Sequence, residues 1–403
     1  MNVDLPERYV RLVLAVGQHD PDYVDAYYGP PEWRPAADAP ARPLSALRDE
    51  ATALAGALDT ADPPLHPIRI SYLRVQLRAV EARLRMRAGE RLSFDEESRA
   101  LYDAVAPTHP DAYFERALAE LEARLPGGGP LVSRYEAFRS AFVVPAGALA
   151  RVFSCAIDHA RSVTRRHIAL PAGERFTVEY VSGRSWSGYN WFKGEATSLI
   201  QVNTDLPVYV DRAVDLACHE GYPGHHVYNA LIERDLVGAR GWTEFSVYAL
   251  FSPQSLIAEG TANFGIDVAL PGEARTAFER DDLYPLGGLD PTRAEEYAGV
   301  RAILDRLAYA GNEAARRYLD GRITRDEAID WLERYTLMPR ARAEQRVRFF
   351  EQYRSYVINY NLGQDMVRAY IERRGGTADA PERRWTEFAA LLSTPLPPSA
   401  LAL

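Results

Sequence analysis

Apolar residues recur at helical spacing along most of the chain. The apolar positions of residues 10–16 predict one helix, and those of residues 73–84 predict a longer one whose other face carries arginine and glutamate. Residues Thr324–Glu327 form a capping box, which predicts the start of another helix, and Gly375–Gly376 predicts where a later helix ends. The pattern therefore predicts a mainly helical protein.

One stretch departs from helical spacing. Residues 176–180 alternate between apolar and polar side chains, and the β-type segments 189–191 and 198–202 follow glycine-containing turns. Alternation with a period of two is typical of strands, because successive side chains point to opposite faces of a sheet. We expect these segments to form an antiparallel meander, a small antiparallel β-sheet within the helical fold.

The strongest interruption of the pattern is the run RLPGGGP at residues 124–130. Clusters of glycine and proline mark loops and chain boundaries. We therefore divide the chain into an N-terminal helical region, 1–126, and a second region, 127–403. The alternative is one continuous domain with a long loop, since a length of 403 residues does not decide the number of domains.

The composition restricts the partners. The chain has 56 Asp and Glu against 47 Lys and Arg, a net charge of −9, so we expect no nucleic-acid partner, because phosphate binding needs basic patches. No apolar run reaches the ~18–20 residues that span a bilayer, and the start has no signal-peptide pattern. Two cysteines cannot form a disulfide framework. These features predict a cytoplasmic protein with no membrane partner and leave its oligomeric state open.

Three of the eight histidines fall in one octapeptide, His219–His226, which reads HEGYPGHH. Histidine is the commonest metal-ligating side chain, and Glu220 directly follows the first histidine. An adjacent carboxylate is suited to accept the proton of a metal-activated water. The octapeptide therefore predicts a metal site with Glu220 as the general base.

The spacing within the octapeptide demands a break in the helix. On a continuous helix His225 would point ~120° away from His219, and His226 would recover the face but lie ~10 Å along the axis. Pro223 removes a helical hydrogen bond and Gly224 permits unusual dihedral angles. We therefore expect a break at these two residues that turns one of the two later histidines back toward the metal.

A third ligand is expected from a following helix. Ser252 and Pro253 are typical of a helix start, and Glu259 lies in the middle of that helix among apolar and small residues. A buried carboxylate there is costly unless it is paired or binds metal. Gly260 and Ala262 would let this helix approach another closely. Two histidines and one glutamate leave an open coordination position, as in catalytic zinc sites that hold one Zn²⁺ ion; the alternative is a polar network in the core.

The octapeptide resembles the signature of a bacterial domain-of-unknown-function family with the pattern HExxPGHH, which is regarded as related to zinc metallopeptidases. More widely, the site resembles the gluzincins, and residues 254–259 are similar to the third-ligand helix of the thermostable carboxypeptidase Taq family. Residues 323–329 and 356–363 look like later blocks of that family. The resemblance covers roughly residues 170–370, and no motif extends it to the N-terminal half.

The resemblance implies a zincin-like (gluzincin) fold and assigns the second ligand to His225, with His226 as the alternative. It also exposes two departures. Where many gluzincins carry a carboxylate that orients a ligand histidine, this chain has Asn263, whose amide oxygen can accept a hydrogen bond without bringing charge. A histidine expected before Thr324 is absent, and Asn312 and Glu313 stand in that region.

Several further residues are candidates for substrate contacts. Tyr360 is the candidate for binding the oxyanion of the scissile carbonyl, and Tyr356 would share its helical face. The histidine that does not bind metal, His226, would donate to substrate or support a ligand. In zincin folds an edge strand pairs with the substrate backbone, and Ser198–Asn203 is the candidate here, with a purely structural strand as the alternative.

Charged candidates complete the set, each with an ordinary solvated role as its alternative. They are Arg346, Arg348 and Arg354 for a peptide carboxylate, Asp215 for the support of a ligand, and Lys193 near the site.

The resulting hypothesis is a zinc-dependent hydrolase, a carboxypeptidase or oligopeptidase, with a peptide or small amide as substrate. His219, His225 and Glu259 hold the zinc ion, Glu220 moves the proton, and Tyr360 or His226 steadies the oxyanion. The alternatives are a metal-dependent hydrolase of another amide or ester, and an inactive zinc-stabilised binding protein.

Overall fold

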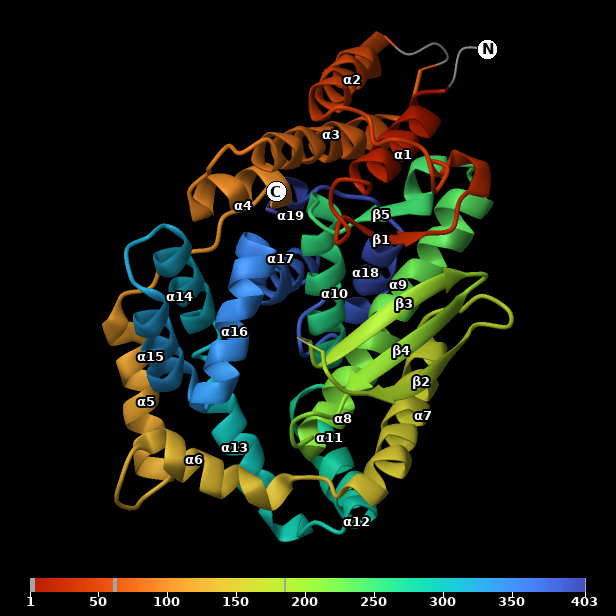
Figure 1. Ribbon diagram of the computed structural model, residues 1–403. Coiled ribbons are helices and arrows are strands. Elements are labelled where there is room, and N and C mark those ends of the chain that lie inside the picture. Colours follow the sequence, from red (N-terminus) through yellow and green to blue (C-terminus); the bar gives the residue numbers. More distant parts are fainter. Residues whose placement is uncertain (1–3, 61–63, 185, 403) are drawn as a thin grey trace.

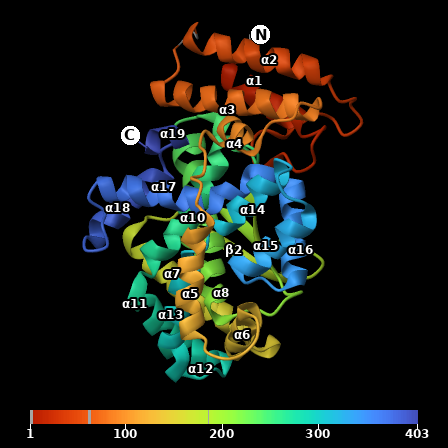
Figure 2. The same ribbon diagram turned by 90° about the vertical axis from the view of Figure 1, so that its left-hand side faces the viewer.

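Helices make up most of the chain in the computed structural model, which describes residues 4–60, 64–184 and 186–402 (Figure 1). The helices of the first part are α1 (Leu5–Val16), α2 (Leu44–Ala57), α3 (Pro67–Arg87), α4 (Phe94–Tyr102), α5 (Asp111–Arg124), α6 (Leu131–Arg139) and α7 (Leu149–His167). Helices α1, α2 and α3 form a layer at one end of the molecule (Figures 1 and 2). The helices predicted over residues 10–16 and 73–84 are confirmed as parts of α1 and α3.

The second part of the chain continues with helices after the sheet. They are α8 (Val210–Leu216), α9 (His225–Ile232), α10 (Pro253–Ala269), α11 (Gly272–Phe278), α12 (Tyr284–Gly287), α13 (Ala294–Asp305), α14 (Ala310–Leu319), α15 (Arg325–Thr336), α16 (Arg340–Tyr353), α17 (Ile358–Arg373), α18 (Pro381–Leu392) and α19 (Pro398–Leu401). The capping box is confirmed, because the Thr324 side chain and Glu327 exchange hydrogen bonds with each other's backbone at the start of α15. Helix α17 ends two residues before Gly375, also as predicted.

The three predicted strands exist as β2 (Arg175–Val181), β3 (Gly188–Gly194) and β4 (Thr197–Asn203), but their order differs from the prediction. The order is β2-β4-β3: β4 is antiparallel to β3 and parallel to β2. A tight turn with positive φ at Glu195 and Ala196 joins β3 to β4 as a hairpin. The other edge of β4 pairs with β2. The antiparallel meander is therefore wrong, and the sheet is mixed.

The same order corrects the prediction for Ser198–Asn203. These residues lie in β4, which has a hydrogen-bonded strand on each side, so its backbone cannot pair with a substrate. Within this sheet the strands with a free edge are β2 and β3. A second pair of strands, β1 (Val24–Tyr27) and β5 (Val247–Ala249), was not predicted; it is antiparallel and brings the N-terminal region beside β3.

Apolar side chains from both sides of residue 126 share the main hydrophobic core. It includes Val10 and Leu12 of α1, Leu77 of α3, Leu256 of α10 and Val367 of α17. A smaller core joins α5 to α13 and α15. The division of the chain at residue 126 remains a prediction. Among the described residues, no helix combines the length and the apolar character that crossing a bilayer requires.

Candidate metal centre

The predicted break in the helix is present at Pro223 and Gly224. Helix α8 runs into a π-helical turn, Ala217–Gly221, and α9 starts afresh at His225 after a cis Tyr222–Pro223 peptide. The Gly224 N–H donates to the carbonyl of Cys218 at 2.9 Å. A Cβ at Gly224 would lie 1.9 Å from the carbonyl oxygen of His219, so only glycine fits this reversal. The break brings the start of α9 back against the first histidine of the motif.

Helix α10 carries the third candidate ligand and packs closely on α17. A Cβ at Gly260 would lie 2.5 Å from the Gly363 backbone, and one at Gly363 would lie 2.6 Å from the carbonyl of Leu256. The expected close approach at Gly260 is therefore confirmed. The helix begins at Pro253 as predicted, although the Ser252 hydroxyl donates to the Ala249 carbonyl at 2.6 Å instead of capping the helix.

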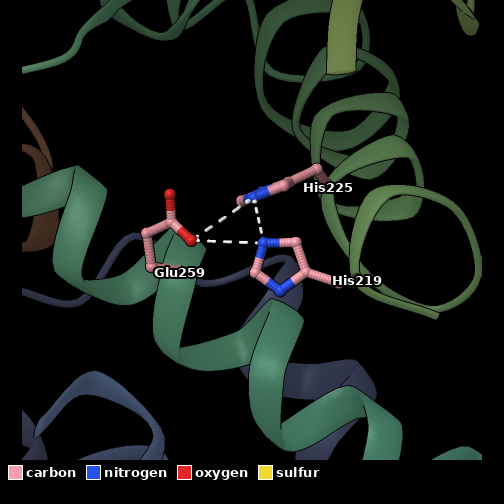
Figure 3. Close-up of side chains that lie close together, drawn as sticks. All are labelled: His219, His225 and Glu259. Carbon is pink, nitrogen blue, oxygen red and sulfur yellow. Dashed lines mark hydrogen bonds and ion pairs between the residues drawn. The ribbon is translucent and has the colours of Figure 1, made fainter. Parts of the chain in front are cut away.

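The three predicted ligands converge on one point (Figure 3). The Nε2 atoms of His219 and His225 lie 3.1 Å apart, and they lie 3.3 and 3.7 Å from Oε2 of Glu259. One ligand atom from each residue lies within 4.8 Å of the other two, and all three residues line the same cavity. Between the two candidates for second ligand, the structure brings His225 to this point.

Neighbouring side chains orient two of these ligands. Asn263, one turn after Glu259 on α10, donates from Nδ2 to the carbonyl of Tyr360 at 2.9 Å. Its Oδ1 is thereby turned toward Nδ1 of His219, 2.9 Å away, which leaves Nε2 of that ring for a metal. The Tyr356 hydroxyl donates to Oε1 of Glu259 at 2.7 Å and leaves Oε2 for the same role. Asn263 is therefore placed to accept a hydrogen bond from a ligand histidine through its amide oxygen, at the position where many gluzincins have a carboxylate.

The donor set fits a zinc ion. Oε2 of Glu259 is buried and accepts no well-directed hydrogen bond, which is costly for a carboxylate oxygen unless a cation lies beside it. Burial alone would raise the pKa of Glu259, but the nearby His219 and His225 rings hold it well below its ordinary value. Burial lowers the pKa of His225, but Glu259 and Glu220 outweigh this effect and raise it to about 9. The side chains thus create a strongly cation-attracting point, and two imidazoles with one carboxylate are the ligands of many catalytic zinc sites.

Glu220 lines the cavity beside these ligands, and its carboxylate has no hydrogen-bond or ion-pair partner among the described residues. Its backbone carbonyl accepts from Nδ2 of Asn190 on β3 at 2.7 Å. A Cβ at Gly188 would lie 3.1 Å from Oε1 of Glu220 and 2.6 Å from the Leu216 side chain, so β3 passes close to the carboxylate at this residue. The cavity itself measures about 930 Å³.

The two candidate tyrosines differ in what their hydroxyls contact. The Tyr356 hydroxyl is engaged with Glu259, whereas the Tyr360 hydroxyl has no hydrogen-bond partner among the described side chains and lines the cavity. Burial, with a further contribution from Glu259, raises the pKa of Tyr360 well above its ordinary value, so its phenol stays protonated and able to donate. The two rings lie 5.8 Å apart, consistent with the shared face expected from the sequence.

His226 is turned away from the cavity. Its Nδ1 lies 2.9 Å from the Ser198 hydroxyl and its Nε2 lies 3.2 Å from Oε2 of Glu174, and the side chain is 1% exposed. Glu174 also accepts from the Tyr222 hydroxyl and the Arg161 guanidinium. A buried ring with both nitrogens engaged cannot reach a substrate. The predicted hydrogen bond from His226 to the substrate is therefore wrong. His226 instead fixes the start of α9 against the sheet.

Of the three candidate arginines, the structure places one in the cavity. Arg346 lies over the rings of Phe349 and Phe350 with no carboxylate partner among the described residues. Arg354 is paired with Glu97 at 2.6 Å, and Arg348 is exposed outside the cavity lining. Arg342, one turn before Arg346 on α16, was not predicted; it also lines the cavity without a carboxylate partner in the described chain.

The remaining candidates have structural or surface roles. Asp215 pairs with Arg275 and Arg212; burial would raise its pKa, but these two guanidiniums lower it to about 2. Lys193 is exposed and lies over the Trp191 ring. Asn312 donates to Asn361 at 3.0 Å, and Glu313 is buried against Arg316. None of these side chains contacts the three ligands directly.

Asp25 on β1 is a residue that sequence reasoning missed. It lines the cavity, and the Tyr189 hydroxyl of β3 donates to its Oδ1. Nearly 200 residues separate it from the octapeptide, and its strand reads as an ordinary VDAY segment, so no local signal marks it.

Comparisons with known proteins inform on the fold alone. No family model and no curated protein matches the chain. Among solved structures, a "putative lipoprotein" from Colwellia psychrerythraea matches with a TM-score of 0.52 at 14% identity, over 92% of this chain and 69% of that one. A structure titled BsuCP has a TM-score of 0.49 at 11% identity, over 97% of this chain and 88% of that one. At these identities the first match supports a shared mainly helical architecture, and the second carries no argument.

Proposed function

We propose that this protein is a zinc-dependent peptidase of zincin-like (gluzincin) architecture that hydrolyses short peptides. The observation that carries the proposal is the convergence of His219, His225 and Glu259 at the wall of a cavity that Glu220 also lines. Two histidines and a glutamate leave a coordination position open, as catalytic zinc sites do. Cavities of this volume are typical of small-ligand sites.

The residues divide the work of hydrolysis among them. A bound zinc ion supplies Lewis-acid chemistry, which promotes ionisation of water and polarises a carbonyl. The Glu220 carboxylate, which has no partner among the described side chains, accepts the proton of the attacking water and carries it to the leaving amine. The protonated Tyr360 phenol donates a hydrogen bond to the oxygen that gains negative charge. Asn263 and Tyr356 hold two of the ligands in position.

Arg346 favours a peptide over another amide or ester. The buried guanidiniums of Arg83 and Arg316 are paired, with Asp20 and with Glu313. Half-buried Arg346 has no such partner among the described residues, and it lines the cavity together with Tyr360. A peptide C-terminal carboxylate would supply the missing charge with bidentate geometry. We therefore infer that the cavity binds a peptide end, as a carboxypeptidase or an enzyme of small peptides does.

The test is the Glu220→Gln substitution, which keeps the shape of the side chain and all three ligands. We expect the zinc-loaded variant to keep one zinc ion per chain and to lose at least ~1,000-fold in rate on any short peptide that the zinc-loaded wild type cleaves. Equal rates for the two proteins would contradict the role of Glu220. A wild type that cleaves esters but no peptide in a library would replace the peptidase with another hydrolase, and zinc binding without any hydrolysis would favour a binding protein.

A further inference from the structure

The N-terminal strand β1 places a carboxylate in the cavity that neither the ligand set nor the proposed chemistry uses. Strand β1 pairs with β5 at Val24 and at Ala26, and the register shifts between them, so Asp25 is the extra residue of a β-bulge. A bulge re-aims a side chain out of the regular alternation of its strand. Here the side chain lines the cavity, and the Tyr189 hydroxyl on β3 holds one of its oxygens.

Asp25 has no cationic partner among the described side chains. Most acidic groups of low exposure in this protein do have one, for example Glu97 with Arg354, Glu244 with Arg69 and Glu174 with Arg161. Burial raises the pKa of Asp25 to about 6, with Tyr189 and His225 opposing this and Glu259 and Glu220 adding to it. The carboxylate therefore lines the same cavity as the three candidate ligands, is mainly ionised near neutral pH, and has no ion-pair partner among the described side chains.

A bound zinc ion does not remove this imbalance. Its two positive charges are matched by the carboxylates of Glu259 and Glu220, so the charge of Asp25 is left over. Arg346 presents the opposite excess in the same cavity. The two come from different parts of the fold, β1 beside the sheet and α16 on the other side of α10 in Figure 1. Half-buried Asp25 and, in the same cavity, half-buried Arg346 and Arg342 have no partner of opposite charge among the described side chains, and together they complement a zwitterion.

We propose that Asp25, held by Tyr189, binds the free α-ammonium group of the substrate, and that the substrates are short peptides recognised at both ends. This inference rests on the proposed peptidase function, and it specifies the substrate class of the same site. Asp25 acts as a specificity residue: it accepts hydrogen bonds from the ammonium group and takes no part in bond cleavage. N-terminal blocking would remove the charge and leave the carboxylate unpaired in the complex.

The test measures binding to zinc-loaded Glu220→Gln protein, in which hydrolysis is suppressed. Calorimetry compares alanyl-phenylalanine with N-acetyl-alanyl-phenylalanine, and we expect about 10- to 100-fold tighter binding of the free peptide. Adding Asp25→Asn should bring this ratio close to one. The matched control, Asp22→Asn, makes the same charge change three residues earlier at an exposed side chain outside the cavity lining and should leave the ratio intact.

Four outcomes would overturn the inference. They are an absent preference for the free amine, a preference that survives Asp25→Asn, loss of zinc from the Asp25→Asn variant, and equal preference for an N-acetylated peptide carrying a lysine side chain. Zinc content is therefore measured for each variant. Wild-type hydrolysis of the same peptides separates the two claims: cleavage without an amine preference overturns this inference alone, and an amine preference in binding without cleavage overturns the peptidase.

Discussion

Two adjacent histidines in this protein, His225 and His226, each lie beside a buried glutamate, yet their surroundings are opposite. Around His226 every polar atom is engaged: its two nitrogens meet Ser198 and Glu174, and Glu174 also accepts from Tyr222 and Arg161. Around His225 the polar atoms face one another, and Oε2 of Glu259 accepts no well-directed hydrogen bond. The first arrangement satisfies all of its polar atoms, whereas the second leaves Oε2 of Glu259 without a hydrogen bond.

The difference shows that a histidine beside a carboxylate does not identify a metal site. The distinguishing feature is that ligand atoms converge while supporting side chains, here Asn263 and Tyr356, occupy the other polar atoms of the same residues. The Ser198, His226 and Glu174 chain has the order of a nucleophile, base and acid, but all three side chains are buried outside the cavity lining. The two regions therefore differ in whether their side chains line the cavity and in whether their ligand atoms converge on one point.

The largest expected effect comes from making the same substitution at each of the two histidines. His225→Ala should weaken zinc binding by at least ~1,000-fold, because it leaves two ligands. His226→Ala should keep one zinc ion per chain but lower the free energy of unfolding by about 2–4 kcal/mol, because it leaves buried partners unpaired. Elemental analysis after dialysis and urea unfolding measure the two effects. Loss of zinc from the His226 variant alone would reverse the assignment.

The second-largest expected effect is a loss of folding stability in acid, which comes from the network around His226. Burial raises the pKa of Glu174, but His226, Tyr222 and Arg161 outweigh this and lower it to about 2 from an ordinary value of 4.5. A lowered pKa in the folded state gives stability that is fully present above pH 4.5 and is lost as the pH falls toward 2. We expect a loss on the order of 2–3 kcal/mol from this group, measured by urea unfolding between pH 7 and 3.

Glu174→Gln should show a shallower loss over the same range, because the neutral side chain has no proton to gain. The matched control is Glu179→Gln on β2, the strand that directly follows Glu174; its side chain is exposed, and the variant should follow the wild type. If all three proteins lost stability in parallel, the ionised Glu174 would not support this network.

The smallest expected effect concerns zinc affinity and the side chain that supports Glu259. Tyr356→Phe removes the hydrogen bond to Oε1 of Glu259, and we expect zinc affinity to fall by about 10- to 100-fold, because supporting bonds orient a ligand without binding the ion. Competition with a chromophoric chelator measures the affinity. Tyr353→Phe removes a hydroxyl from a neighbouring ring that makes no contact with the ligands, so its affinity should match the wild type. Equal affinities for all three proteins would mean that Tyr356 does not orient Glu259.

Much of the site could be predicted because it depends on local chemistry. The break at Pro223 and Gly224 follows from backbone rules, and a mid-helix Glu259 follows from the cost of burying a carboxylate. The hydrogen bond of Asn263 to His219 follows from its place one turn after Glu259. The assignment of His225 over His226 depended on resemblance, because ideal helix geometry places neither beside His219.

The remaining features depend on contacts between distant segments. The position of β4 in the sheet is set by its pairing with β2, and strand alternation alone does not report order. Glu174 and Asp25 belong to the surroundings of the two histidines only because the sheet and the β1–β5 pair bring them there. The signal that could have suggested Glu174 is weak: it directly precedes a strand that packs beside the octapeptide.

The proposed metal centre is tested most directly by the position of zinc in crystals of the zinc-loaded protein, located by anomalous scattering at the zinc absorption edge. We predict one peak, ~2.0–2.2 Å from Nε2 of His219, Nε2 of His225 and an oxygen of Glu259, with His226 still bound to Glu174. A peak held by His226, or no peak near Glu259, would contradict it.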